Sequence, residues 1–232
     1  MADRHDRFRG VWGQAGFSLA EILMATAISS VVLLALYLLY DVNQVTFVKG
    51  EQQADLQQNA RIAMDRIVRE LRLAGSERQT PPVIPTPCAT AIQSAEATRI
   101  NFIANINDND PTEKVEYTHD VASNPPRIKR EQWPFLPPGP SCTAPSWSAS
   151  GGAQSFAERV TALTFTYYDA NNVCLGGAAA PDCPAPPAAV PAGSLGSIQR
   201  ISVTITTQDT QTGSKAQPFT LRAEVRPRNL GL

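Results

Sequence analysis

The order of apolar and polar positions divides this chain into three parts. From Phe17 to Tyr40 nearly every position is apolar, and Glu21 is the only charged residue in that stretch. From Asp41 onward, apolar residues recur every three or four positions, which is the pattern of an amphipathic helix. The positions of this second stripe are Leu56, Ala60, Ala63, Ile67, Leu71 and Ala74.

The apolar and amphipathic parts are predicted to form one long helix. As a helix, the 24 residues from Phe17 to Tyr40 span roughly 36 Å. That length is enough to cross a hydrocarbon core of about 30 Å. No proline occurs before Pro81, and Gly75 follows the last apolar position of the stripe, so we expect it to cap the helix.

Beyond the helix, short segments alternate between apolar and polar residues, which is typical of half-buried strands. In the segment 161–169, for example, Leu163, Phe165 and Tyr167 point one way, while Tyr168 and its polar neighbours point the other. Similar alternation occurs in the segments 99–105, 113–119, 126–132, 200–208 and 219–229. We therefore predict an α+β fold, with one antiparallel sheet that has a wet face and packs on the amphipathic helix.

These patterns suggest five regions. Two Pro-rich stretches, Trp133–Ser150 and Gly176–Gly196, are predicted to be irregular surface loops within the last region. The regions are a leader at 1–16, a membrane or filament-core helix at 17–40, its amphipathic continuation at 41–75, a Pro-rich linker at 76–97 and a β-rich head at 98–232.

Charge and cysteine content narrow the environment of the head. The formal net charge is −1 and neither sign forms a long run, so we expect no nucleic-acid partner. The cysteine spacing does not fit a zinc site and favours disulfides in an oxidising compartment. Three pairings of Cys88, Cys142, Cys174 and Cys183 are possible, and we favour Cys174 with Cys183 and Cys88 with Cys142.

The residues give little sign of catalysis. Only two histidines occur, His5 and His119, and no phosphate-binding glycine loop is present, so we expect neither an enzyme nor a cofactor. Asp108 and Asp110 lie in an acidic segment that offers weak calcium ligands. That segment lacks the EF-hand spacing, so a polar turn explains it better than a metal site.

Glu21 is the unusual residue of the apolar stretch. A carboxylate in a membrane helix costs about 2.5–3.5 kcal/mol at mid-bilayer, and a plain anchor held by Arg4, Arg7 and Arg9 has no use for it. If the chain is cut after Gly16, however, Phe17 gains a positive α-amino group. In a bundle of such helices, Glu21 of one chain would then pair with the amine of a neighbour, where the attraction is little screened.

The segment GFSLAEILMATAISS, starting at Gly16, resembles the cleavage and methylation motif of type IV prepilins and type II secretion pseudopilins. This resemblance implies that a prepilin peptidase cuts after Gly16 and methylates Phe17, and that Glu21 is the family's assembly glutamate. The run from Gln57 to Gly75 and the closing strands resemble PilW-like minor pilins and J-type pseudopilins. Major pilins commonly carry a proline in the membrane helix, and its absence here favours a minor subunit.

These inferences lead to a functional prediction. We expect a minor pilin-like structural subunit that enters a type IV pilus and helps prime or cap its assembly. Its partners would be other pilin or pseudopilin subunits and the prepilin peptidase. It would lie in the bacterial inner membrane as a single-pass protein with a periplasmic head, and then move into the filament at the cell surface. A J-type pseudopilin of type II secretion and a membrane-anchored adhesin or receptor stay open as alternatives, as do the position in the filament and the ligand of the head.

Overall fold

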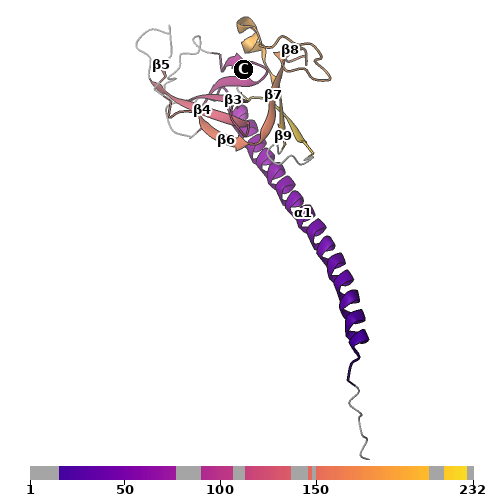
Figure 1. Cartoon of the computed structure of the whole chain (residues 1–232). Helices are drawn as coiled ribbons and strands as arrows, with labels where there is room; N and C mark the ends of the chain where they lie inside the picture. Colours follow the sequence, from indigo (N-terminus) through magenta and orange to yellow (C-terminus); the bar gives the residue numbers. More distant parts are fainter. Residues whose placement is uncertain are drawn as a thin grey trace, which may run out of the picture. The chain divides into compact units, whose positions relative to one another are not determined.

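The computed structural model describes residues 16–76, 90–106, 113–136, 146–147, 150–208 and 217–228. The contacts between residues divide the chain into two units, Met1–Gly50 and Glu51–Leu232. The helix α1 (Leu19–Arg72) begins in the first unit and ends in the second. The remaining elements of the described chain belong to the second unit (Figure 1).

The amphipathic part of α1 packs into the head as predicted. All six positions of the predicted stripe are buried, from Leu56 to Ala74, and Met64 is buried beside them. The helix ends at Arg72, and Gly75 adopts a left-handed backbone with a φ of 79°, as expected of a capping glycine. The amide N–H of Gly75 donates to the carbonyl of Ile103 at 2.9 Å, which links the helix end to the sheet.

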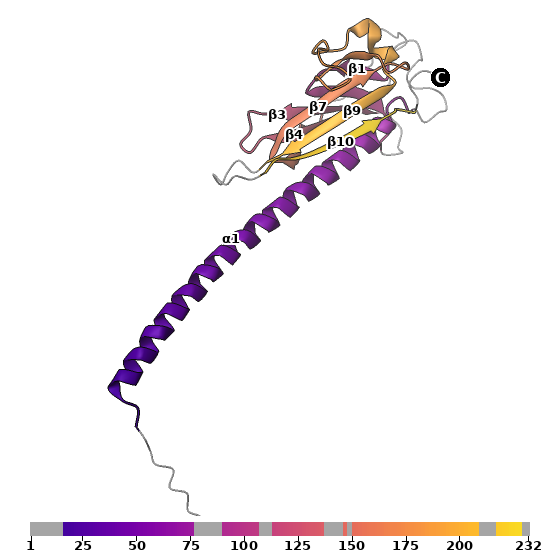
Figure 2. The ribbon, with the colours of Figure 1, turned by 90° about the vertical axis from the view of Figure 1, so that its right-hand side faces the viewer.

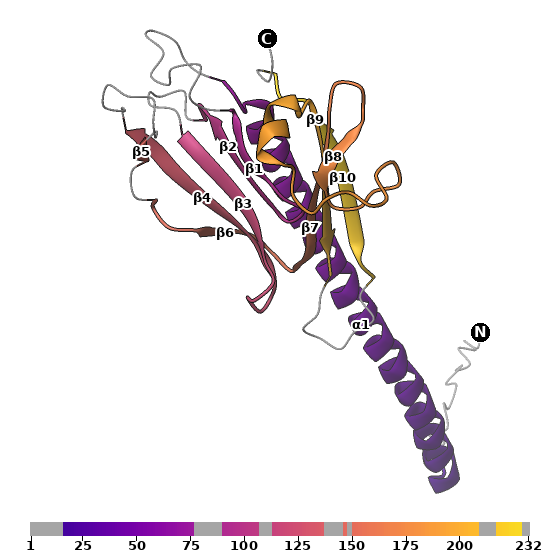
Figure 3. The ribbon, with the colours of Figure 1, turned by 90° about the horizontal axis from the view of Figure 1, so that it is seen from above.

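The head holds two antiparallel sheets, where the sequence led us to expect one. In the first, the order is β1-β2-β3-β4-β5, with β6 also paired to β4; in the second, it is β10-β9-β7-β8. Figure 3 shows the two sheets beside the last turns of α1. The strands of the first sheet are β1 (Ile92–Ala95), β2 (Arg99–Ala104), β3 (Glu113–Asp120), β4 (Arg127–Leu136), β5 (Ser146–Trp147) and β6 (Gln154–Glu158). Those of the second are β7 (Val160–Tyr168), β8 (Cys174–Gly177), β9 (Arg200–Thr207) and β10 (Phe219–Val225), and a short 3-10 helix, η1 (Ala192–Ser197), precedes β9.

One hydrophobic core joins α1 to both sheets. It contains Ile67 of α1, Phe102 of β2, Phe165 of β7 and Val203 of β9, all with no exposed surface. The positions predicted to face inward on the strands β2, β3, β7 and β9 are buried. Figure 2 shows β7, β9 and β10 side by side, and β10 pairs with β9 along its whole length without a break in register.

The second sheet differs from the prediction of a wet outer face. Tyr168 and Thr166 were expected to face water, but both are buried. The reason is that the chain after β8 folds back over them: Thr166 Oγ1 donates to the carbonyl of Ala178 at 2.9 Å, and the Tyr168 hydroxyl donates to Asp182 Oδ1 at 2.7 Å. Alternation predicts two faces, but it does not predict what covers the second one.

Several boundaries also differ from the prediction. Strand β1 lies inside the segment 76–97 that we expected to be a linker, because Ile92 and Ala95 reach the core. Of the two stretches predicted to be irregular, Trp133–Ser150 contains the end of β4 and all of β5. The other, Gly176–Gly196, contains the end of β8 and most of η1. The remainder of the Pro-rich stretch 176–196 contains turns and isolated bridges, and its residue Ala189 pairs with Glu96 next to β1 of the first sheet.

Candidate functional site

The first turn of α1 holds Glu21 through a reciprocal set of hydrogen bonds. Glu21 Oε2 accepts from the Ser18 amide N–H at 3.0 Å and from the Ser18 hydroxyl at 3.2 Å. The Glu21 amide N–H in turn donates to Ser18 Oγ at 3.2 Å. This is a capping box, in which a serine and a glutamate three residues later satisfy backbone groups at the start of a helix. The pattern Ser-x-x-Glu before an apolar run is readable in the sequence, and our sequence analysis missed it.

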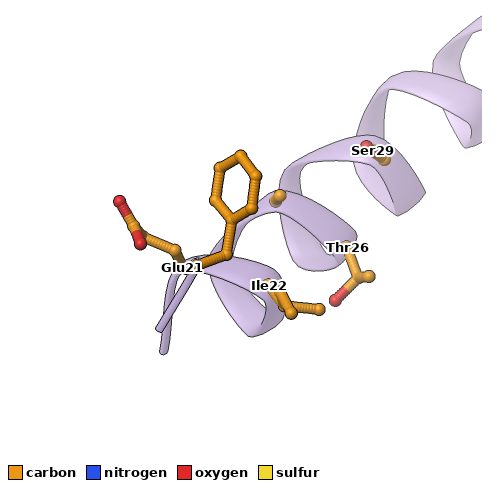
Figure 4. Close-up of a pocket in the computed structure, with 6 residues that line it drawn as sticks. Glu21, Ile22, Thr26 and Ser29 are labelled. Atoms are coloured by element: carbon orange, nitrogen blue, oxygen red, sulfur yellow. The ribbon is translucent and has the colours of Figure 1, made fainter. Parts of the chain in front are cut away.

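The bonds to Ser18 leave half of the carboxylate available. Both use Oε2, and no hydrogen bond among the described residues uses Glu21 Oε1. Glu21 itself is exposed on the surface of this first unit. Figure 4 shows its side chain extending away from the helix, on a face that Ile22, Thr26 and Ser29 also line. The site therefore presents a carboxylate whose direction is fixed by its own helix and which can still accept from another chain.

The helix that follows exposes an unbroken apolar surface. By length and composition, α1 is the one helix in the described chain that could cross a membrane. Core helices of soluble proteins have similar compositions, but they are buried by their own fold, whereas none of this apolar window is buried. Two of its hydroxyls bond within the helix: Thr26 Oγ1 donates to the carbonyl of Leu23 at 2.9 Å, and Ser30 Oγ to that of Thr26 at 2.7 Å. This surface fits lipid or other apolar helices and does not fit water.

A second acid of α1 lies in the opposite kind of environment. Glu70 is only 2% exposed. Its Oε2 accepts from the hydroxyl of Tyr117 on β3 at 2.6 Å and pairs with Arg130 Nε on β4 at 3.0 Å, and its Oε1 pairs with Arg66 Nε at 3.0 Å. Arg66 and Glu70 lie four residues apart, a spacing typical of an ion pair on a solvated helix face, but Glu70 is buried. The buried stripe is wider than its six predicted positions and includes residue 70 at its margin. A carboxylate can be buried there because the sheet supplies hydrogen-bonding and charged partners.

The electrostatics of this cluster follow from burial and pairing. Burial raises the pKa of Tyr117 well above its ordinary value, and the neighbouring charge of Glu70 adds to the effect. Burial lowers the pKa of Arg130, but the hydrogen bond and the charge of Glu70 outweigh this, so that its pKa lies above the ordinary value. Tyr117 is therefore a neutral donor and Arg130 a cation at every physiological pH.

The predicted bridge between Cys174 and Cys183 is present, with the two Cα atoms 5.7 Å apart. It closes the loop that carries Asp182 over the second sheet. There, the Arg200 guanidinium lies 3.8 Å from the centre of the Tyr168 ring and pairs with Asp182. Burial, together with the hydrogen bond to Asp182, raises the pKa of Tyr168 to about 12.

The remaining candidates are a histidine, two cysteines and two aspartates. His119 lies on β3 with its Nε2 2.9 Å from the carbonyl oxygen of Val160, a backbone contact. Cys88 and Cys142, and the weak calcium candidates Asp108 and Asp110, lie outside the described residues. Within the described ranges, no three His, Cys, Asp or Glu side chains are grouped as metal ligands would be.

Comparison with known proteins supports the reading of the N-terminus. A family model described as the prokaryotic N-terminal methylation motif matches residues 13–37. This range contains Gly16, Phe17, the capping box and most of the exposed apolar surface. No curated protein matches the chain. The motif, the long apolar helix and the antiparallel sheets on its C-terminal part are consistent with a type IV pilin-like protein.

Proposed function

We propose that this chain is a minor pilin-like structural subunit, cut between Gly16 and Phe17 by a prepilin peptidase and then incorporated into a type IV pilus. The methylation motif at residues 13–37 supports a substrate of that peptidase and points to a structural subunit rather than an enzyme. The observation that carries the proposal is the first part of α1. A fully exposed apolar surface begins there with one carboxylate, held by Ser18 and open on its other oxygen.

Cleavage would create the second half of the assembly contact. The new α-amino group belongs to Phe17, which directly precedes Ser18 in the capping box. In a bundle of apolar helices, Glu21 Oε1 of one subunit would accept from the Phe17 amine of a neighbour. A charge pair in an apolar setting is little screened, and leaving either charge unpaired there is strongly unfavourable. The pair would therefore select one register between neighbouring helices.

The apolar helix would supply the remaining contact. Ala25 and Ser29 lie on the same helix face as Glu21; both are small and they are four residues apart. Small residues at this spacing let two helix backbones approach closely within a membrane. The apolar helix and the motif support membrane insertion before assembly, with the head proposed to lie in the periplasm.

The choice of a minor subunit rests on the absence of proline between Phe17 and Tyr40 and on the resemblance of the closing strands to PilW-like proteins. Such a subunit would prime or cap assembly at the filament tip. A J-type pseudopilin of a type II secretion system would use the same leader, helix and glutamate.

The mature N-terminus tests the proposal. Intact mass and N-terminal sequencing of the protein from its native membrane should show a chain that starts at Phe17 and carries one added methyl group. A Gly16→Glu variant, with a bulky charge at the proposed cleavage position, should accumulate uncut. A chain that starts at Met1 in assembled material, or downstream of Tyr40, would overturn the proposal.

A further inference from the structure

We infer that Glu70 is a positioning residue that fixes the register of α1 on strands β3 and β4, and thereby decides which turns of the helix the head occupies. Its carboxylate holds Tyr117 of β3 at 2.6 Å and Arg130 of β4 at 3.0 Å. Arg130 is 7% exposed and also donates to Gln132 Oε1 at 2.8 Å, so that its own direction is fixed.

The apolar stripe of α1 does not define one register as sharply. A shift of the helix by one turn, about 5.4 Å, moves each residue close to the place of the residue four positions before it. Ala60 would then take the place of Leu56, Met64 that of Ala60, and Leu71 that of Ile67, so that apolar residues replace apolar ones. Such cores tolerate changes of shape when their patterning and total volume are kept.

Glu70 behaves differently under the same shift. It is the only charged residue among the buried residues of α1. A shift by one turn would release Ala74 from its bridge to Ala104 and bring it opposite Tyr117 and Arg130. Glu70 would move to the half-exposed place of Arg66, and the buried guanidinium and hydroxyl would lose their carboxylate partner. Unpaired buried charges are far less favourable than a misfitted methyl group. Selection of one helix register is the best-attested role of a single buried polar residue.

The register determines how much of α1 the head covers. Residues before Leu56 stay outside the core, and in a filament they would be left for contact with neighbouring subunits. Only this last consequence rests on the proposed function, because the register itself is a property of the head.

Distance measurement between two spin labels tests the inference on the full chain in detergent micelles. A keto amino acid at Ile62 and at Val173, which are 55% and 57% exposed, allows oxime-linked labels that leave the native cysteines untouched. The otherwise unchanged chain should give one narrow distance distribution. The apolar triple variant Glu70→Leu/Arg130→Leu/Tyr117→Phe should fold, with retained circular dichroism, but should show a second population displaced by up to about 5 Å.

Two further variants keep the result decisive. Glu70→Gln has the same size and still accepts from Tyr117, and it should broaden the distribution even if the triple variant does not fold. The control Arg200→Leu/Glu224→Leu removes a 2.8 Å ion pair, the pairing of Arg200 with Asp182 and its contact with the Tyr168 ring on the second sheet. It leaves Glu70 and its partners unchanged and should leave the distribution unchanged. A single native distance in both Glu70 variants would overturn the inference, as would the same broadening in the control. Because the measurement needs neither cleavage nor a filament, its outcome is separate from that of the proposed function.

Discussion

The two ends of α1 have similar side chains but lie in opposite environments. Each carries one acid beside an apolar surface: Glu21 in the first turn and Glu70 near the last. Glu70 and the stripe around it are buried by the chain's own sheets, whereas Glu21 and the apolar surface that follows it remain exposed. The C-terminal part of the helix buries its apolar surface within the chain, but the N-terminal part does not. The N-terminal surface is therefore suited to packing against other molecules.

Loss of the Glu70 carboxylate should have the largest effect on the head. Glu70→Leu leaves Arg130 buried and unpaired, so the free energy of unfolding should fall by about 3–5 kcal/mol. Urea denaturation in detergent, followed by circular dichroism, measures the change. The matched change Glu21→Leu removes an exposed carboxylate from the other end of the helix and should leave the unfolding of the head unaltered. Equal losses in the two variants would break the comparison.

Truncation of apolar residues should separate the two parts of the helix again. Ile67 is completely buried, so Ile67→Ala should lower the free energy of unfolding by about 2–5 kcal/mol, through lost burial and a cavity. Ile28 is exposed, and Ile28→Ala should change it by less than about 0.5 kcal/mol. The same denaturation experiment measures both. A large loss in Ile28→Ala would show that the first unit is packed within the chain.

The head should lose stability at alkaline pH. Burial raises the pKa of Tyr117 and that of Tyr167 above their ordinary value near 10. Above about pH 10 the unfolded chain releases these protons while the folded head retains them, so the free energy of unfolding falls by about 1.4 kcal/mol per pH unit for each tyrosine. Unfolding measured between pH 9 and pH 11 should show this slope, and Tyr117→Phe should reduce it by one tyrosine's share. An unchanged slope in that variant would place the proton loss elsewhere.

The capping box should have the smallest effect. Ser18→Ala removes the hydroxyl that bonds Glu21 and its amide, and the loss of such a cap is worth about 1 kcal/mol of helix stability. Hydrogen exchange of the amides in the first turn of α1 should therefore speed up by roughly fivefold, with unchanged exchange in the head. Ser18→Thr keeps the cap and should behave as the parent chain. Equal exchange in the alanine and threonine variants would mean that the box does not hold the turn.

The sequence predicted the features that depend on periodicity and missed those that depend on tertiary partners. The stripe from Leu56 to Ala74, the cap at Gly75 and the inward faces of strands β2, β3, β7 and β9 follow from the spacing of apolar residues, and all are present. The split into two sheets, the cover over Tyr168 and the burial of Glu70 depend on segments distant in sequence, which no local pattern encodes.

The candidate site was predictable for a different reason. Glu21 is out of place in an apolar run, and this is visible without a structure. Its hydrogen bonds with Ser18 were equally visible as a local motif, and they add a restraint on the carboxylate that the sequence analysis had not considered.

The most direct test of the account is the incorporation of a Glu21→Ala subunit into filaments. The carboxylate is proposed to find its partner in another chain, so the alanine variant should still be cut after Gly16 and should keep a folded head. Its amount in sheared, purified filaments, measured by immunoblot against the membrane pool, should fall at least tenfold, which corresponds to about 1.4 kcal/mol. Incorporation equal to that of the parent chain would contradict the account.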